Sequence, residues 1–494
     1  MTTPSLTPAQ DHAPADAGGA AIEAFLKPKS IALIGAAPAE QRSIRGALMR
    51  VLRRGGFDGR IVPVNPSYAE INGTPCYPSI GAVGFAVDLA VIAIPAEFVC
   101  DAAAECAAAG VRAAIIISSG FAEESAEKAH LQLRLSEVAR RTGMRICGPN
   151  CEGFYNLLDG VAATFSAAAE PAEAENQAIV GAGRVAVVAQ SGGLGFAMLN
   201  RGRALGLDFT HIVTTGNECD LTAVDFIGHF ATDAVSNVII AYLEEIRDVA
   251  GFRLAAERAR ASGKMIIVIK IGQSEPGRRA ALAHTGSITG AAADLDAMFA
   301  DLGVLVAVEA DEAVAAALAF VTNPISAGRR VGIVTTAGGA GTVLCESLAG
   351  AGFAIPALSE PLQCLLRPTF PNYGSAANPV DVTAQGIFTG GAMRALEVLL
   401  DGDEVDLVVF AATLSGERSI SIDIDALREL AARSAKPILI YSYTLPSGFA
   451  RQALRRAGLP VFAHIRDLVA AAHALTFDRR RRAGRLAETG LHSS

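Results

Sequence analysis

The chain has 494 residues, of which 51% are hydrophobic, 6% aromatic and none tryptophan, and its formal net charge is −8. This length predicts about three domains, because one hydrophobic core rarely grows that large. The negative charge argues against nucleic acid as the main partner, and the longest apolar runs are too short to span a membrane.

Eight cysteines are scattered along the chain, and none forms a Cys-x-x-Cys pair. Cys147 and Cys151 stand close together without matching histidines, so we expect no zinc site and no other metal ligand set. The first residues do not have the pattern of a signal peptide. We therefore expect a cytoplasmic protein with reduced thiols.

Short apolar runs separated by Ala-rich, helix-like stretches recur along the chain. Alternation of this kind predicts βαβ units and an α/β fold with parallel sheets. The candidate strands are residues 30–36, 60–66, 88–95, 113–118, 184–191, 237–244, 265–272, 330–339, 406–415 and 436–443.

Two stretches of low complexity interrupt this rhythm and are interpreted as linkers, at residues 167–183 and 322–329. They separate three domains of ordinary size. The predicted domains are residues 21–166, 184–321 and 330–478, with tails at residues 1–20 and 479–494.

The second and third pieces resemble each other. RVAVVAQSGGLG begins at Arg184 and RVGIVTTAGGAG at Arg330, and later SGKMIIVIKIG is matched by SAKPILIYSYT. Two copies of one α/β unit explain both matches. After the later match only the second piece continues with AHTGSITG, so the scaffold does not require His284 and we expect a function for it.

A glycine-rich turn runs from Gly35 to Gly46 in the first piece. Such a turn between strand and helix exposes backbone N–H groups that suit a phosphate, although a purely structural turn remains open. The turn departs from G-x-G-x-x-G, and the next strand ends in Val-Asn-Pro, which weakens a dinucleotide interpretation. Further donors come from Arg42, Ser43 and Arg45.

The second piece offers a turn, a histidine and a carboxylate. The turn at residues 190–195 adds the Ser191 hydroxyl to exposed backbone N–H groups, which suits one phosphate. An imidazole such as that of His284 can carry a phosphoryl group, and Glu244, at the end of a predicted strand, could orient it. A loop histidine without a role and a surface carboxylate remain alternatives.

Taken together, the motifs resemble the superfamily of NDP-forming acyl-CoA synthetases, which includes ADP-forming acetyl-CoA synthetase and is related to succinyl-CoA synthetase. The resemblance covers residues 30–477. Its motifs, in order, are SIALIGA, VPVNP, DLAVIAIPA, SSGFAE, GPNCEG, VAVVAQSGGLG, TTGNECDLTAVDF, AYLEE, AHTGSITG and NPVDVTA.

The resemblance implies a Rossmann-like CoA-binding domain followed by two flavodoxin-like domains. His284 would be the phosphorylated histidine, and Glu244 would stabilise it, with Glu245 standing where relatives commonly have glycine. The phosphoryl group would be held by Ser191, Gly192 and Gly193. The CoA site would be lined by Gly35, Arg42, Ser43, Arg45, Gly46, Asn65, Pro66, Ile94 and Pro95.

Single-chain members of the superfamily carry an ATP-grasp module, and this chain shows no such sequence. The chain resembles the separate α subunit of ADP-forming acetyl-CoA synthetases. This resemblance implies a separate ATP-grasp β subunit, which would bind ATP or ADP with Mg²⁺. The two kinds of subunit would form an oligomeric complex. Acyl-CoA and phosphate would give acyl phosphate, then phosphohistidine and free acid, and finally ATP.

Two other functions remain open at this point. One is a non-catalytic acyl-CoA-binding or regulatory subunit, and the other is an NAD-dependent oxidoreductase with a Rossmann-like first domain. The sequence does not name the acyl group. Tyr155, Asn217 and residues 378–383 are candidate pocket walls, although ordinary loop roles explain them slightly better.

Overall fold

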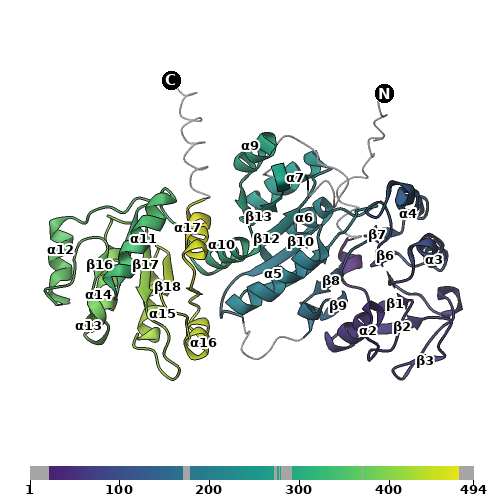
Figure 1. The fold of residues 1–494 in the computed structure, drawn as a ribbon, viewed down its shortest axis with the longest axis horizontal. Helices are drawn as coiled ribbons and strands as arrows, with labels where there is room; N and C mark the ends of the chain where they lie inside the picture. Colours follow the sequence, from purple (N-terminus) through teal and green to yellow (C-terminus); the bar gives the residue numbers. More distant parts are fainter. Residues whose placement is uncertain are drawn as a thin grey trace. The chain divides into compact units, whose positions relative to one another are not determined.

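The computed structural model describes residues 22–170, 178–271, 275–277, 279, 292–369 and 371–477 (Figure 1). The chain divides into two compact units, Met1–Phe165 with Thr214–His229, and Ser166–Val213 with Phe230–Ser494. The domain boundaries expected from the sequence stay a prediction.

Residues 214–229 group with the first unit although they follow a strand of the second. Their backbone explains this, because the N–H groups of Asn217, Cys219 and Leu221 each donate a hydrogen bond of 2.9 Å to a carbonyl of residues 146–149. These bonds tie the TTGNECDL segment to the GPN segment.

The first unit contains a five-stranded parallel sheet in the order β2-β1-β5-β6-β7, the first sheet. Its core is aliphatic, as the low aromatic content predicts. The strands are β1 (Ser30–Ile34), β2 (Arg60–Val64), β5 (Leu89–Ile92), β6 (Ala113–Ile116) and β7 (Arg145–Cys147).

Helices and two small hairpins complete the first unit. The helices include one at residues 22–26, α2 (Ile44–Arg54), α3 (Ala96–Ala108) and α4 (Ala129–Thr142), and the last two pack against each other. The hairpins are β3 (Glu70–Ile71) with β4 (Thr74–Pro75), and β8 (Gly153–Asn156) with β9 (Val161–Thr164). The helix α6 (Ala223–Thr232) starts in the first unit and ends in the second.

Five strands of the second unit lie side by side in the order β14-β13-β12-β10-β11, and these five are called the second sheet. The strands are β10 (Arg184–Ala189), β11 (Asp208–Thr214), β12 (Ser236–Leu243), β13 (Met265–Lys270) and β14 (Val304–Ala307). Helix α10 packs on α5 and β12, while α7 packs on α9 and β13. These helices are α5 (Gly192–Leu205), α7 (Val249–Ala261), α9 (Ala292–Leu302) and α10 (Ala310–Thr322).

The third sheet has the order β16-β15-β17-β18-β19, and all its strands are parallel. The strands are β15 (Val331–Thr335), β16 (Val380–Asp381), β17 (Leu407–Ala412), β18 (Ile438–Ser442) and β19 (Val461–Phe462). The helices are α11 (Gly338–Gly350), α12 (Glu360–Leu366), α13 (Thr383–Phe388), α14 (Gly391–Asp401), α15 (Ile424–Arg433), α16 (Gly448–Arg456) and α17 (Ile465–Phe477).

Each of the three sheets places its strands in the order 2-1-3-4-5 when they are numbered along the chain. This is the flavodoxin-like, doubly wound order, in which ligands bind beyond the carboxyl ends of the strands, between strands 1 and 3. The predicted α/β fold is therefore confirmed. Ligands are expected where β1 meets β5, β10 meets β12, and β15 meets β17.

The internal duplication is visible in the backbone. In the second sheet the N–H of Gln190 donates to the carbonyl of Tyr242 at 3.1 Å. In the third sheet the N–H of Thr336 donates to the carbonyl of Ala411, also at 3.1 Å. The two copies therefore share this hydrogen bond at the position where a ligand is expected.

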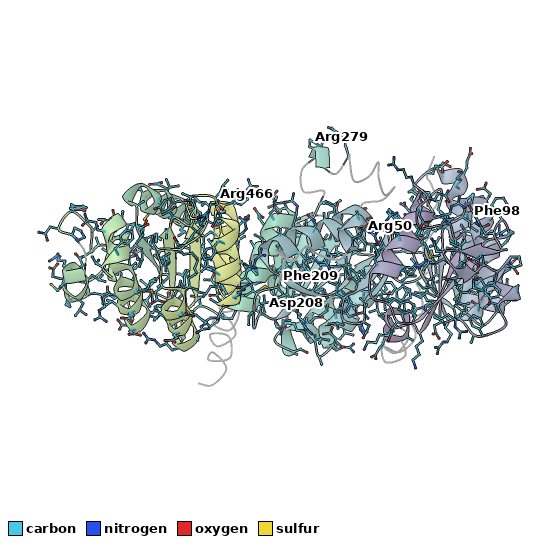
Figure 2. The ribbon with its side chains drawn as sticks, turned by 90° about the horizontal axis from the view of Figure 1, so that it is seen from below. Arg50, Phe98, Asp208, Phe209, Arg279 and Arg466 are labelled. Carbon is cyan, nitrogen blue, oxygen red and sulfur yellow. The ribbon has the colours of Figure 1, made fainter. Side chains whose placement is uncertain are left out.

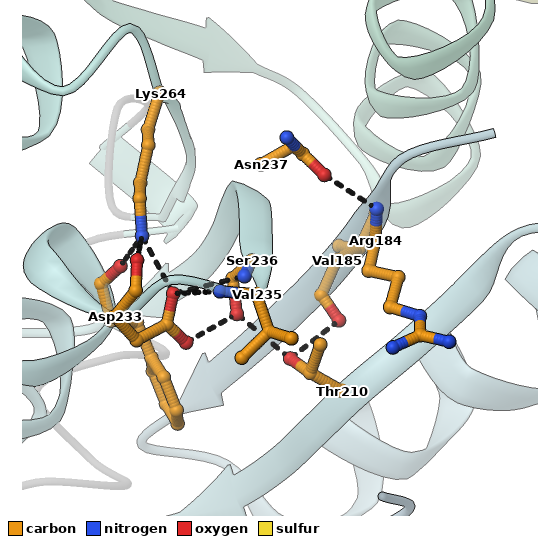
Figure 3. Close-up of polar contacts among 9 residues, drawn as sticks. Arg184, Val185, Thr210, Asp233, Val235, Ser236, Asn237 and Lys264 are labelled. Atoms are coloured by element: carbon orange, nitrogen blue, oxygen red, sulfur yellow. Dashed lines mark hydrogen bonds and ion pairs between the residues drawn. The ribbon is translucent and has the colours of Figure 1, made fainter.

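A buried ion pair secures the opposite, amino edge of the second sheet (Figure 3). Lys264 Nζ lies 2.6 Å from Asp233 Oδ1, and both side chains are 10% exposed or less. Lys264 also donates to the carbonyl of Phe230 at 2.7 Å and to that of Asp233. Ser236 Oγ donates to the other carboxylate oxygen at 2.7 Å and contacts Thr210 Oγ1 at 2.9 Å. Both charges are therefore compensated by several partners.

Candidate functional site

A cavity of about 210 Å³ lies in the first unit, at the carboxyl ends of β1, β2 and β5. This is the switch point of the first sheet, where a ligand is expected. Five residues proposed from the sequence line it: Gly35, Arg45, Asn65, Pro66 and Ile94.

Two of these residues fix the shape of the cavity. Gly35 has φ of +88°, and a Cβ there would stand 2.6 Å from Ile94 Cγ2 and 2.7 Å from the Ala93 carbonyl oxygen. Asn65 is buried and donates from Nδ2 to the Ala36 carbonyl at 2.8 Å, while its Oδ1 accepts from Ser67 N at 3.0 Å. The turns after β1 and β2 are thereby held together.

The amino end of α2 provides positive potential beside the cavity. Ser43 caps the helix by accepting a 3.1 Å hydrogen bond from Gly46 N, and the first turn contains no acidic residue. Arg45 projects from this turn and lines the cavity. Free backbone N–H groups, the helix dipole and a guanidinium together favour an anion such as a phosphate.

The hairpin β3–β4 holds the glycine-rich turn through hydrogen bonds of Asn72. Asn72 Oδ1 accepts from Ala39 N at 2.9 Å, and its Nδ2 lies 3.0 Å from both oxygens of the Glu40 carboxylate. Arg50, labelled in Figure 2, donates to the Ala39 carbonyl at 3.0 Å. The turn is therefore preorganised by contacts that make no use of a ligand.

The remaining residues proposed for this site do not line the cavity. Arg42 and Pro95 are exposed, and Ser43 and Gly46 shape the start of α2. The cavity also has walls that the sequence reasoning missed: Pro78, Ser79, Ile80, Ala102, Glu105 and Cys106. Pro78, Ser79 and Ile80 could have been suspected, because the YPSI segment at residues 77–80 comes soon after the VNP segment at residues 64–66. The residues of α3 carry no local signal.

The second unit has a separate candidate position at the carboxyl ends of β10 and β12. Helix α5 begins at Gly192 with Ser191 as its N-cap residue, and the first turn contains no acidic residue. The Ser191 side chain makes no capping hydrogen bond, in contrast to Ser43 and Ser447. Gly193 has open space around the position of a Cβ. The end of this helix could accept one phosphate.

The two adjacent glutamates after β12 have different neighbours. Glu245 Oε2 pairs with Arg247 Nε at 3.0 Å. Burial, the charge of Glu244 and a hydrogen bond to that carboxylate raise the pKa of Tyr242 to about 12. Glu244 thus lies beside a phenol that stays neutral at physiological pH, whereas Glu245 is engaged by a guanidinium.

His284, the proposed phosphohistidine, lies outside the described residues. Two of the candidate pocket walls have identifiable structural contacts. The Asn378 side chain bonds to Ile333 N at 2.9 Å and to the Val331 carbonyl at 2.7 Å, which secures β15. Asn217 Nδ2 contacts Glu123 and Gln132.

Within the described part of the chain, no group of three or more His, Cys, Asp or Glu residues could hold a metal ion. All eight cysteines are unpaired. No helix among the described residues has the length and apolarity needed to cross a membrane.

Two family models match the chain. A CoA binding domain matches residues 29–156, and a succinyl-CoA ligase like flavodoxin domain matches residues 182–320. The first contains the cavity, and the second contains Ser191 and Glu244.

Curated relatives match over most of the chain. The α subunit of ADP-forming acetate–CoA ligase II of Pyrococcus furiosus is 32% identical over 462 residues, which cover 92% of this chain and 97% of that subunit. The ADP-forming acetate–CoA ligase I of Archaeoglobus fulgidus is 31% identical over 89% of this chain, but only 61% of its own length is matched.

A solved structure agrees with these matches. It is the acetyl-coenzyme A synthetase 1 of Candidatus Korarchaeum cryptofilum in complex with phosphate and ADP, with a TM-score of 0.79 and 29% identity over 94% of this chain and 97% of that one. The chain belongs to the family of ADP-forming acyl-CoA synthetases. The predicted family and the predicted role as a CoA ligase are confirmed.

Proposed function

We propose that this chain is the CoA-binding, phosphohistidine-forming subunit of an ADP-forming acyl-CoA synthetase that works with a separate ATP-grasp subunit. The observation that carries the proposal is the presence of two polar side chains at the switch point of the second sheet. Ser191 and Glu244 follow its strands β10 and β12, whereas the third sheet, the duplicate copy, has Ala337 and Thr413 in the corresponding places. The scaffold alone does not require these groups.

The CoA end of the reaction belongs to the first unit. The cavity is smaller than a whole cofactor, so it would enclose one part of CoA while the rest lies along the surface. Arg45 and the amino end of α2 would bind phosphate groups of CoA. Gly35, which has no side chain, and Asn65, which holds the adjacent turn, would let CoA approach the sheet closely. Arg42, on the exposed face of the turn, would add charge attraction.

The reaction would proceed in three covalent steps. A phosphate oxygen attacks the thioester carbonyl, the C–S bond breaks, and CoA leaves as the thiol after taking a proton. The imidazole of His284 then attacks phosphorus, and the carboxylate of the free acid leaves. Finally an oxygen of ADP attacks the phosphorus of the phosphohistidine, the P–N bond breaks, ATP forms and the imidazole of His284 is regenerated. Splitting the exchange conserves the energy of the thioester in a transferable phosphoryl group.

The residues of the second sheet would serve the middle step. The amino end of α5, with the Ser191 hydroxyl, would hold the phosphoryl oxygens and stabilise their charge. Glu244 would accept a hydrogen bond from the imidazole and orient its reactive nitrogen. The proposal is supported by the positions of Ser191 and Glu244, which follow the neighbouring strands β10 and β12.

The nucleotide step would take place on another chain. The Pyrococcus relative is named as a subunit, and the longer Archaeoglobus relative extends well beyond the matched part. We therefore propose a partner with an ATP-grasp domain that binds ADP together with Mg²⁺. Acetate is the first candidate acid because both relatives are named as acetate–CoA ligases.

The test incubates the purified chain with phosphate and, separately, acetyl-CoA, succinyl-CoA or an aromatic acyl-CoA. We expect release of CoA thiol with one preferred thioester, followed by formation of a phosphoryl-enzyme. Formation of the phosphoryl-enzyme should be at least about 100-fold slower in His284→Ala, because the nucleophile of the second step is lost. His130→Ala is the matched control, because His130 is an exposed histidine of the first unit. Binding of CoA without thiol release, even after addition of an ATP-grasp subunit, would indicate a binding module instead.

A further inference from the structure

Both the oxygen and the nitrogen of the Gln190 side-chain amide form hydrogen bonds with the backbone of the turn after β12. Its Oε1 accepts from Glu244 N at 2.6 Å and from Glu245 N at 2.9 Å. Its Nε2 donates to the Glu245 carbonyl at 2.9 Å. Three hydrogen bonds from a single side chain therefore fix the backbone on which Glu244 stands.

The three hydrogen bonds of Gln190, called the clamp below, connect two segments that follow different strands. Gln190 follows β10 and precedes Ser191, the N-cap of α5, while the clamped turn follows β12. Strands β10 and β12 are parallel neighbours, with Ala189 opposite Tyr242. The side chain thus connects the proposed phosphate-binding helix end directly to the turn that carries Glu244.

The duplicate copy shows that the fold can form without this clamp. The register of β15 and β17, with Thr335 opposite Ala411, places Thr336 at the position of Gln190. Thr336 Oγ1 instead contacts the Tyr443 hydroxyl at 3.1 Å. The turn after β17 is held instead by the turn after β18, since Leu414 N donates to Thr444 Oγ1 at 3.2 Å.

The clamp coincides with the other chemical groups of the second sheet. The copy that has Gln190 also has Ser191, Tyr242 and Glu244, and the copy that has Thr336 has Ala337, Ala411 and Thr413 instead. A side chain needed only for folding would be expected in both copies. The difference indicates that the clamp serves the reaction.

We propose that Gln190 is a positioning residue that holds Glu244 in register with the phosphate-binding end of α5. This inference rests on the proposed function of Glu244. Gln190 supplies no charge and no phosphate ligand, so its loss should slow phosphoryl transfer and leave acyl-CoA binding in the first unit unchanged.

The experiment uses the full chain with phosphate and the preferred acyl-CoA, and follows the rate of phosphoryl-enzyme formation. Gln190→Thr introduces the residue that the duplicate copy tolerates, and Gln190→Met keeps the volume without hydrogen bonds. We expect the rate constant at saturating acyl-CoA to fall about 10- to 100-fold, as for a displacement of about 1 Å in a catalytic group, with the half-saturating concentration of acyl-CoA within about twofold. Thr336→Ala is the matched control and should keep the wild-type rate.

A double-mutant cycle with Glu244→Gln separates positioning from a general structural effect. If Gln190 acts through Glu244, Gln190→Thr should have little further effect in the Glu244→Gln background. The inference is overturned if Gln190→Thr transfers phosphoryl at the wild-type rate, or if its effect is the same with and without Glu244. Absence of any phosphoryl-enzyme in the wild-type chain would instead contradict the proposed function.

Discussion

Gly46 determines how closely the glycine-rich turn folds over the start of α2. A Cβ at this position would stand 2.2 Å from the Gln41 carbonyl oxygen and 2.8 Å from that of Pro38. Both contacts are with backbone, which cannot rotate away. Gly46 therefore shapes the proposed CoA site without lining it.

We predict that Gly46→Ala displaces the turn, lowers the affinity for CoA at least about tenfold and lowers the free energy of unfolding by about 1–3 kcal/mol. Isothermal titration with CoA and thermal unfolding measure the two effects. Gly84→Ala is the matched control, because a Cβ there meets nothing within 4 Å. Unchanged CoA affinity in Gly46→Ala would place the CoA site elsewhere.

The raised pKa of Tyr242 makes the free energy of unfolding fall at alkaline pH. Burial and the neighbouring Glu244 raise its pKa from 10.0 to about 12, so the neutral phenol is favoured in the folded state. Below pH 10 the phenol is neutral in both the folded and the unfolded chain, and no stability is lost. Above pH 10 the unfolded chain releases the proton first, and stability falls until the folded phenol also ionises.

We predict that the wild-type chain loses about 1 kcal/mol more stability than Tyr242→Phe between pH 9 and pH 11. Urea unfolding at several pH values gives the two curves. Tyr68→Phe, which changes an exposed tyrosine, should follow the wild-type curve. Parallel curves for wild type and Tyr242→Phe would show that this phenol is not perturbed.

Part of the candidate site could be predicted from sequence for a simple reason. Gly35, Asn65 and Ile94 each follow an apolar strand, and the carboxyl ends of parallel strands meet at one edge. Glu105 and Cys106 reach the same cavity from the end of α3, far from any turn motif. Their contribution depends on tertiary packing, which leaves no local pattern.

At the scale of elements, the ten apolar runs all coincide with strands, because buried parallel strands are continuously hydrophobic. Strand β11 (Asp208–Thr214) was missed, since its sequence DFTHIVT mixes polar with apolar residues. The strands β16 and β19 have only two residues each and give almost no hydrophobic signal. Short or polar strands are defined by their neighbours.

The ion pair of Lys264 and Asp233 supports the second sheet at the edge opposite to the proposed site. Lys264→Met would leave the Asp233 carboxylate buried without its cation. We predict a loss of about 3–5 kcal/mol in the free energy of unfolding, and partial recovery in Lys264→Met with Asp233→Asn. Denaturant unfolding measures both variants.

Because this pair is remote from Ser191 and Glu244 along the strands, folded Lys264→Met should retain phosphoryl transfer per folded molecule. The matched control is Lys27→Met, which breaks an exposed ion pair and should cost less than about 1 kcal/mol. Equal losses for the two lysines would contradict the role assigned to the buried network.

At the scale of the whole molecule, the same sheet topology occurs three times, with different side chains at the carboxyl ends of its strands. The first sheet carries the cavity, the second carries Ser191 and Glu244, and the third has small or hydroxyl residues at the corresponding positions. The duplication was predictable from repeated sequence. The grouping of residues 214–229 with the first unit was not, because it arises from backbone hydrogen bonds between distant segments.

The central claim is that this chain carries a phosphoryl group on His284. The most direct measurement is intact-mass and peptide mass spectrometry after incubation with acyl-CoA and phosphate, with an acid wash as a second sample. The account predicts one acid-labile phosphate, located on the peptide that contains His284 and absent from His284→Ala. A phosphate adduct that persists in His284→Ala, or that maps to another peptide, would contradict it.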